Sequence, residues 1–150
     1  MENVTHLAIT SIPVQTWKEV YDETNAFKEG TIFPELNKPF YVTVQDDKLN
    51  QKEKADSMKM SPREKQLLQI QKISFVADDL RLYLDTHPED KKGLELFKDI
   101  LKKRKTLLKE FALQFYPLTV DCMADIYEEN PDSACYCWVE GPIPWEGGMC

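Results

Sequence analysis

The sequence predicts a mainly α-helical protein, built as a long antiparallel helical hairpin with an extended aromatic N-terminal arm and a C-terminal tail rich in tryptophan and proline. Two long stretches after residue 61 repeat an apolar residue every three or four positions, which is the spacing of one helix face. Residues 8–44 lack this spacing and are rich in proline and aromatic residues, and a polar, charge-mixed stretch follows them. We therefore expect three regions: an arm (1–45), a polar linker (46–60) and a hairpin with its tail (61–150).

The arm is predicted to hold one short helix followed by an extended run. Asp22 is a suitable N-cap, and Gly30 is suited to end the helix because glycine readily adopts the left-handed conformation found there. Pro34 and Pro39 disfavour helix at the residues that precede them, so we expect 31–40 to be largely extended. A segment with many aromatic residues and little regular structure is expected to lie on another surface.

Both helices of the hairpin have sequence signals at their ends. Ser61, Pro62 and Glu64 have the spacing of a capping box with proline at the first helical position, and apolar residues follow at positions 67, 70, 73, 77, 80 and 84. The second helix is predicted from about Glu89 to residue 116, with apolar residues at positions 94, 97, 101, 108, 111 and 115, and Pro117 stops it. Two long helices joined by a tight corner form an antiparallel hairpin.

The tail is predicted to begin with a short helix near 119–128. Beyond Pro131 it is rich in turn-forming residues, and Trp138 and Trp145 alternate with glycine and proline. We expect this part to be extended and to lie against an apolar surface.

Acidic residues crowd the corner of the hairpin around one of the two histidines, and one interpretation of them is a metal or acid/base site. The residues concerned are Asp78, Asp79, Asp85, His87, Glu89 and Asp90. Ferritin-like metal sites need Glu-x-x-His pairs, which the sequence lacks, and two adjacent helical residues diverge by about 100°. The interpretation that we favour is helix-end chemistry, with Thr86 and Glu89 as a second capping box or His87 as the cap before Pro88. The predicted structural residues of the corner are Asp85, Thr86, His87, Pro88 and Glu89.

The four cysteines, Cys122, Cys135, Cys137 and Cys150, all lie in the tail. Four thiolates could hold zinc, but structural zinc sites usually place two to four residues between paired cysteines, and Cys135-Tyr136-Cys137 has one. We expect free thiols, with oxidative cross-linking as the functional alternative. These cysteines remain weak metal candidates, and we assign no metal site, no cofactor and no catalytic residue. The sequence contains no nucleophile elbow, phosphate loop or dinucleotide fingerprint.

Charge is distributed unevenly along the chain, whose net charge is −7. Residues 61–116 carry twelve basic and nine acidic groups, whereas residues 117–150 carry seven acidic groups and no lysine or arginine. The one basic cluster, at 102–105, is interpreted as a solvated helix face, with attraction of the acidic tail as a second use. Nucleic-acid binding is therefore poorly supported. No apolar run approaches the roughly 18 residues that a membrane span requires, and the N-terminus lacks a signal-peptide layout, so we expect a protein without a membrane span, made in a cytoplasm.

A two-helix hairpin has an apolar stripe that needs a cover. The arm, the tail or another protein could supply it, and the sequence leaves open whether the arm docks on its own hairpin or on a partner. Such a chain is more typical of an assembly component than of an enzyme with a preformed cleft. The predicted partner-binding residues are aromatic and apolar residues of the arm and tail: Trp17, Tyr21, Phe27, Ile32, Phe33, Pro34, Phe40, Trp138, Pro144 and Trp145.

Several runs of residues resemble known families of bacterial spore coat proteins. The runs FVADDLRLYLDTHPEDKKGLELF, FYPLT and PIPWE are similar to the CotJB family over about 61–146, and EVYDETNAFKEGTIFPELNKPF is similar to the CotJA family over about 8–40. The whole chain resembles a fusion of the two. The linker matches neither.

This resemblance implies a non-enzymatic component of the endospore coat. It implies synthesis in the mother-cell cytoplasm during sporulation, incorporation into the coat, and association with a manganese catalase of ferritin-like fold and with other coat proteins, with self-association also open. Two alternatives remain: a small metal- or redox-active protein that uses the tail cysteines, and a regulatory subunit of the catalase.

Overall fold

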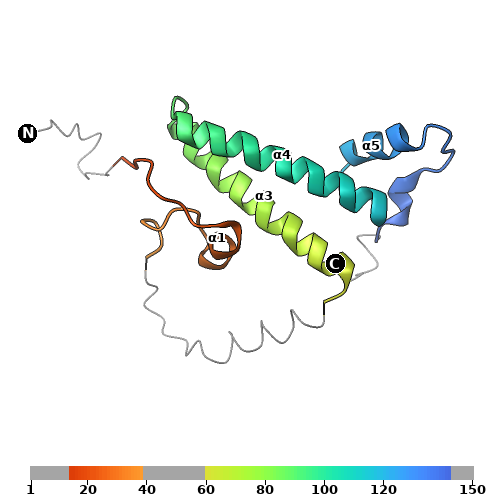
Figure 1. The fold of residues 1–150 in the computed structure, drawn as a ribbon, viewed down its shortest axis with the longest axis horizontal. Helices are drawn as coiled ribbons and strands as arrows, with labels where there is room; N and C mark the ends of the chain where they lie inside the picture. Colours follow the sequence, from red (N-terminus) through yellow and green to blue (C-terminus); the bar gives the residue numbers. More distant parts are fainter. Residues whose placement is uncertain (1–13, 39–59, 143–150) are drawn as a thin grey trace, which may run out of the picture.

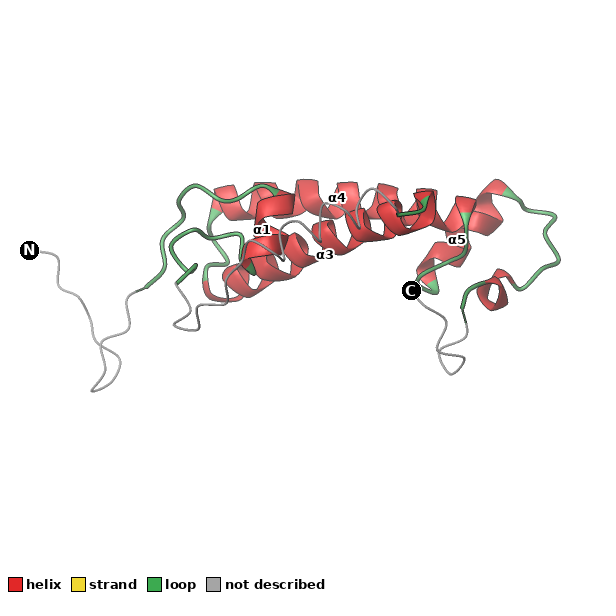
Figure 2. Ribbon diagram, turned by 90° about the horizontal axis from the view of Figure 1, so that it is seen from below, coloured by secondary structure: helices red, strands yellow, loops and turns green. Residues whose placement is uncertain are grey.

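The computed structural model describes residues 14–38 and 60–142. Within these ranges the regular elements are all helical, in the order α1 (Glu23–Glu29), α3 (Pro62–Thr86), α4 (Lys91–Gln114), α5 (Asp121–Glu129) and the 3₁₀ helix η1 (Cys137–Glu140). Helices α3 and α4 run antiparallel along each other and form the predicted hairpin (Figure 1). Helix α1 packs on α3, whereas α5 packs on the C-terminal half of α4. The small helices thus cover different parts of the hairpin (Figure 2). The described residues contain no helix of sufficient length and apolarity to span a membrane.

The predicted start of α3 is confirmed. The Ser61 hydroxyl accepts a hydrogen bond from the backbone N–H of Glu64 at 3.3 Å, and the Glu64 carboxylate accepts one from the Ser61 N–H at 2.7 Å. Pro62 stands at the first helical position. The capping box therefore satisfies donors that the first turn of a helix leaves without a partner.

The predicted start of α4 was wrong by two residues. The cap is Asp90, whose carboxylate accepts hydrogen bonds from the backbone N–H groups of Lys92 and Gly93, both at 3.0 Å. His87 instead ends α3 as its C-cap, with its own N–H bonded to the carbonyl of Tyr83. The Asp90 carboxylate accepts two N–H groups at once, which neither Thr86 nor His87 does at this corner. Helix α4 therefore begins at Lys91, two residues after the predicted Glu89.

The apolar stripe of α4 also differs from the prediction. Leu94 and Leu101 are exposed, whereas Ile100 is 3% exposed and lies in the main core. The reason is that α4 faces the arm as well as α3, so a neighbouring stripe that includes Ile100 and Leu107 packs inward. In α3, four of the six predicted positions are buried: 70, 73, 77 and 80. The buried residues of this helix are Ile70, Ile73, Val76, Ala77, Leu80 and Tyr83.

The arm covers the hairpin of its own chain. As predicted, its helix α1 has Asp22 as N-cap and Gly30, with φ of 80°, as C-cap. The following residues are not fully extended, because Leu36 N–H bonds to the Phe33 carbonyl and closes a turn over Pro34. Proline at the second position favours this kind of turn. Arm residues Ala26, Ile32 and Phe33 join α3 and α4 in the main hydrophobic core.

A second, smaller core lies under α5 and η1. It joins Ala112 of α4, Cys122 and Ile126 of α5, and Cys137 of η1. The tail was predicted to be extended, but Cys137–Glu140 form a 3₁₀ turn instead. Packing explains this: Cys137 is buried in the small core, and Gly141 passes so close to Tyr116 that a Cβ there would lie 3.1 Å from the ring.

Candidate functional site

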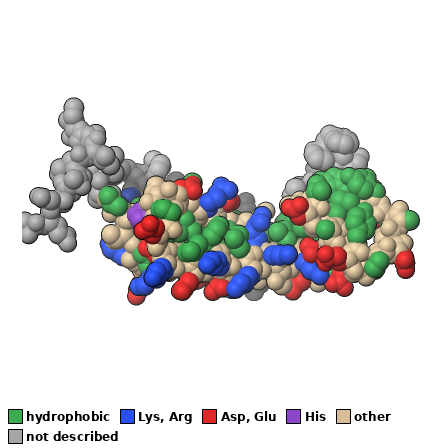
Figure 3. All heavy atoms as spheres, turned by 90° about the horizontal axis from the view of Figure 1, so that it is seen from above, with side chains coloured by type: hydrophobic (Ala, Val, Ile, Leu, Met, Phe, Trp, Pro, Cys, Tyr) green, Lys and Arg blue, Asp and Glu red, His purple; other side chains and the backbone are tan. Residues whose placement is uncertain are grey.

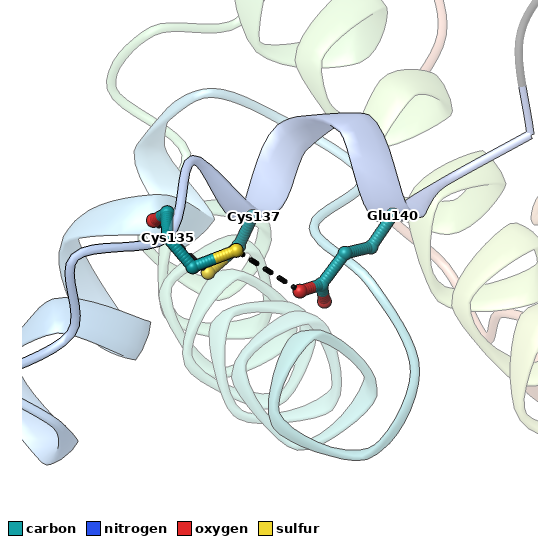
Figure 4. Close-up of side chains that lie close together, drawn as sticks. All are labelled: Cys135, Cys137 and Glu140. Carbon is teal, nitrogen blue, oxygen red and sulfur yellow. Dashed lines mark hydrogen bonds between the residues drawn. The ribbon is translucent and has the colours of Figure 1, made fainter.

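Three potential metal-binding side chains of the tail converge around η1 (Figure 4). The ligand atoms of Cys135, Cys137 and Glu140 all lie within 4.8 Å of one another. The Cys135 thiol donates to the Glu140 carboxylate at 3.5 Å, and the Cys137 thiol donates to the Cys135 carbonyl at 3.6 Å. Residues three apart eclipse each other in a 3₁₀ helix, which places Cys137 and Glu140 on one side of η1. This hydrogen bond to Glu140 raises the pKa of the Cys135 thiol, with further contributions from desolvation and from Cys137.

Cys122, the remaining described cysteine, does not join this cluster. Cys122 is buried in α5, where its thiol lies 3.1 Å from the Thr119 hydroxyl. Cys150 lies outside the described residues. Among the described cysteines, Cys122, Cys135 and Cys137 are free thiols. Sequence reasoning named the two clustered cysteines but missed Glu140, because the i, i+3 spacing brings it near Cys137 only if the segment is helical.

The corner residues lie where the hairpin turns, and one of them contacts the arm. The His87 ring stacks on Tyr83, with ring centroids 4.3 Å apart and planes 2° from parallel, and its Nε2 lies 2.7 Å from the carbonyl oxygen of Gln15. The Tyr83 hydroxyl donates to the Asp90 carboxylate at 2.9 Å. Burial, and then this hydrogen bond, raise the pKa of Tyr83 to about 12. The other four predicted corner residues are exposed: Asp85, Thr86, Pro88 and Glu89.

The acidic pair on α3 divides between two surfaces, as expected for adjacent helical residues. Asp78 is exposed and lies 3.5 Å from Arg81 one turn later. Asp79 faces the arm, where its Oδ2 accepts hydrogen bonds from the Ile32 N–H at 2.7 Å and the Thr31 hydroxyl at 3.0 Å. Asp79 therefore links the arm to the hairpin through two hydrogen bonds. Sequence reasoning missed this role, because the partners of Asp79 are 47 and 48 residues away.

Lysines of α4 pair with both small helices. Lys103 lies 3.2 Å from Glu23 of α1, and Lys109 lies 2.8 Å from Glu129 of α5. Of the predicted basic cluster at 102–105, Lys103 thus pairs with the arm, and the ion pair with the tail is made by Lys109, which lies outside the cluster. The hydrogen bond to Glu129 raises the pKa of Lys109, and the same bond lowers the pKa of Glu129.

The predicted partner-binding residues of the arm lie mostly against the hairpin. Ile32 and Phe33 are 0% and 2% exposed. Trp17 is half-buried and packs edge-on against Phe33 and Tyr83, at 6.0 and 5.4 Å between ring centroids. Phe27 is exposed, although its ring packs edge-on against Phe75. Tyr21 packs beside the core and Pro34 is exposed in its turn, whereas Phe40 lies outside the described residues.

The tail presents a different surface. Tyr136, Trp138 and Val139 are 61%, 40% and 68% exposed, and these three residues define what we call the tail surface. Apolar side chains gather at the end of the molecule that carries α5 and η1 (Figure 3). Pro144 and Trp145 lie outside the described residues. Among the described residues of the predicted binding set, Trp138 is exposed in the tail, and Phe27 and Pro34 are exposed in the arm.

Comparison with known proteins identifies the family of the chain. Residues 64–146 match the family described as CotJB protein, and residues 6–40 match the family described as spore coat associated protein JA (CotJA). No curated protein and no solved structure matches the chain. The first match takes in the hairpin, α5 and η1, and the second takes in the arm with α1. The chain belongs to the CotJB family of spore coat proteins and carries a CotJA segment ahead of its CotJB domain.

Proposed function

We propose that the chain is an assembly component of the endospore coat that binds a manganese-catalase-like coat protein through its tail surface. One observation carries the proposal: Tyr136, Trp138 and Val139, which lie at or next to η1, are exposed in a chain of a spore coat family. Aromatic residues with adjacent aliphatic ones are frequent anchors of protein interfaces. The identity of the occupant is the one that the family resemblance implies.

The location of the other aromatic residues supports the tail as the binding surface. The arm was an equal candidate by sequence, but Ile32 and Phe33 are buried in the core of their own chain. A partner could reach them only after the arm leaves the hairpin, which would expose the apolar faces of both. The tail surface needs no such rearrangement. Protein synthesis in the mother-cell cytoplasm, followed by incorporation into the coat, is part of the same proposal.

The proposal is tested by measuring binding between the purified chain and the purified manganese-catalase-like coat protein. We expect Trp138→Ala to weaken binding by roughly 30-fold or more, since a central aromatic anchor contributes about 2 kcal/mol or more. Leu82→Ala is the matched control, because Leu82 is 62% exposed on α3 and lies on the hairpin itself. Equal affinity of both variants and the unchanged protein would refute the tail surface as the binding site.

Two further measurements separate the neighbouring hypotheses. Catalase activity is assayed with and without the saturating chain: an unchanged rate agrees with an assembly role, whereas a changed rate favours a regulatory subunit. Sedimentation of the chain alone tests self-association. If Trp138→Ala abolishes self-association, the two copies use the tail surface and compete with the partner for it. Deleting the arm is a poor test of binding, because the deletion would uncover the main core along with any binding residue.

A further inference from the structure

The cluster at η1 comes close to the separations that a tetrahedral metal ion imposes. Zinc binds sulfur at about 2.3 Å and carboxylate oxygen at about 2.0–2.2 Å, so the ligands of a tetrahedral site lie roughly 3.5–3.8 Å apart. The distance from the Cys135 sulfur to the Glu140 oxygen is already 3.5 Å. All three ligand atoms fall within 4.8 Å of one another. A small movement of side-chain ends is therefore enough to place an ion between them.

The cluster is positioned by the protein around it. Cys137 is buried beside Ala112, Cys122 and Ile126, so its thiol has little freedom. The carbonyl of Cys135 accepts a hydrogen bond from the Tyr127 hydroxyl at 3.0 Å, which ties this residue to α5. Outer contacts of this kind orient the groups that bind a metal. The geometry is thus set by packing and by a hydrogen bond from a different element, as well as by the local turn.

The surroundings favour a cation and leave room for it to enter. Cys135 and Glu140 are exposed, so an ion reaches the cluster from solvent and one coordination position stays open. Residues 117–150 carry seven acidic groups and no lysine or arginine, which makes the local potential negative. Two thiolates and a carboxylate would repel one another without a positive charge between them, and thiolate ligands select soft or borderline ions such as zinc.

We propose that Cys135, Cys137 and Glu140 bind one zinc ion, or another thiophilic divalent cation, through two thiolates and one carboxylate with the fourth position open. Binding releases the protons of the two thiols and replaces the Cys135-to-Glu140 hydrogen bond with bonds from both residues to the ion. The site differs from a zinc knuckle, because its third ligand is supplied by the eclipsed position of a 3₁₀ turn and not by a second cysteine pair. Its ligands are different residues from those of the tail surface, with which they alternate around η1.

The test uses the full chain, reduced, freed of metal by a chelator and kept anaerobic. Cobalt(II) serves as the spectroscopic probe, because thiolate-to-cobalt charge transfer reports sulfur ligands directly, and zinc is then added to displace it. We expect the charge-transfer absorption to saturate at one cobalt ion per chain and to disappear with one equivalent of zinc. Failure of the reduced, unchanged chain to bind either ion would overturn the proposal.

Single substitutions assign the ligands. Cys135→Ser should lower affinity by roughly 100-fold or more, since losing a ligand costs at least as much as losing an outer contact, and Cys135 is exposed, so the fold tolerates the change. Glu140→Gln should weaken binding while it preserves the charge-transfer absorption. The matched controls are Cys122→Ser and Glu128→Gln, a buried cysteine and an exposed acid of α5 outside the cluster. Equal losses in a control and in its cluster counterpart would contradict the assignment, as would an equal loss in Cys150→Ser.

Circular dichroism of each variant checks the fold. Cys137→Ser places a hydroxyl in the small core, and a loss of helix content there would explain weak binding without a ligand role. The exposed Cys135→Ser variant therefore decides the question: unchanged helix content with unchanged metal affinity rejects the site.

Discussion

Replacing Asp79 tests whether the arm is held on the hairpin by one carboxylate. Its Oδ2 accepts hydrogen bonds from the Ile32 N–H at 2.7 Å and from the Thr31 hydroxyl at 3.0 Å. Hydrogen bonds to a charged group contribute about 1.5–3 kcal/mol each. Because Asp79 is only half-buried, we expect Asp79→Ala to cost about 2–4 kcal/mol. Asp79→Asn keeps an acceptor oxygen and should cost about 1 kcal/mol.

The neighbouring Asp78 is the natural control. It lies on the same helix but is exposed, and its ion pair with Arg81 is also exposed. Surface pairs of this type contribute about 0–1 kcal/mol, so Asp78→Ala should leave stability nearly unchanged. Any general effect of removing a carboxylate from α3 is thereby subtracted.

Hydrogen exchange at the Ile32 amide gives a local measurement of the same interaction. A loss of about 2 kcal/mol corresponds to exchange roughly 30-fold faster. Urea denaturation followed by circular dichroism gives the global free energy of unfolding for comparison. If Asp79→Ala and Asp78→Ala agree within about 0.5 kcal/mol and exchange at Ile32 is unchanged, the carboxylate does not hold the arm, and the reasoning from these distances fails.

Four other expectations concern single positions. Gly93→Ala would place a Cβ 3.2 Å from both Trp17 and Tyr83, so the Trp17 ring must move outward. In a chain whose other tryptophans are replaced by phenylalanine, we expect the fluorescence emission of Trp17 to shift to longer wavelength. Helix content should be maintained, because alanine favours helix over glycine by about 1 kcal/mol. Asp90→Ala should lower stability at neutral pH, because Asp90 caps α4. The N–H of Gly93 foremost, and the Tyr83 hydroxyl, lower the pKa of Asp90 from 3.8, so the charge-dependent part of this stabilisation is present above pH 3.8 and is lost as the pH falls further, which urea denaturation across pH will show. Conversely, the pKa of Tyr83 is raised from 10.0 to about 12. The protonated Tyr83 therefore contributes to folding stability fully below pH 10, and this contribution is lost as the pH rises toward 12. The Tyr83→Phe variant should not show this loss of stability at alkaline pH. Ser61→Ala removes half of the capping box and should cost about 1 kcal/mol in the same assay.

The hairpin could be predicted because its signals are local. The Ser61–Glu64 capping box and the apolar spacing of α3 lie within a few residues of the structure that they specify. The corner was located correctly, but its cap was misassigned because several residues at this corner have side chains that can cap a helix. Only the geometry shows that Asp90 accepts two backbone N–H groups.

The features that the sequence did not reveal depend on distant contacts. Leu101 and Ile100 of α4 are both plausible core positions by spacing, and the docking of the arm decides in favour of Ile100. The role of Asp79 depends on residues 47 and 48 positions away. Glu140 joins the cysteine cluster only because the tail forms a 3₁₀ turn. Local periodicity carries no information about any of these.

The docking of the arm has a consequence for stoichiometry. The CotJA segment and the CotJB domain are matched separately, over residues 6–40 and 64–146, yet the first covers the core of the second. If two separate chains made this contact, dilution would dissociate them and an excess of either would stay uncovered. Tethering converts the contact into an intramolecular one at an effective concentration on the order of millimolar. Every hairpin then carries its own cover in a ratio of one to one, whatever amount of the protein the cell makes.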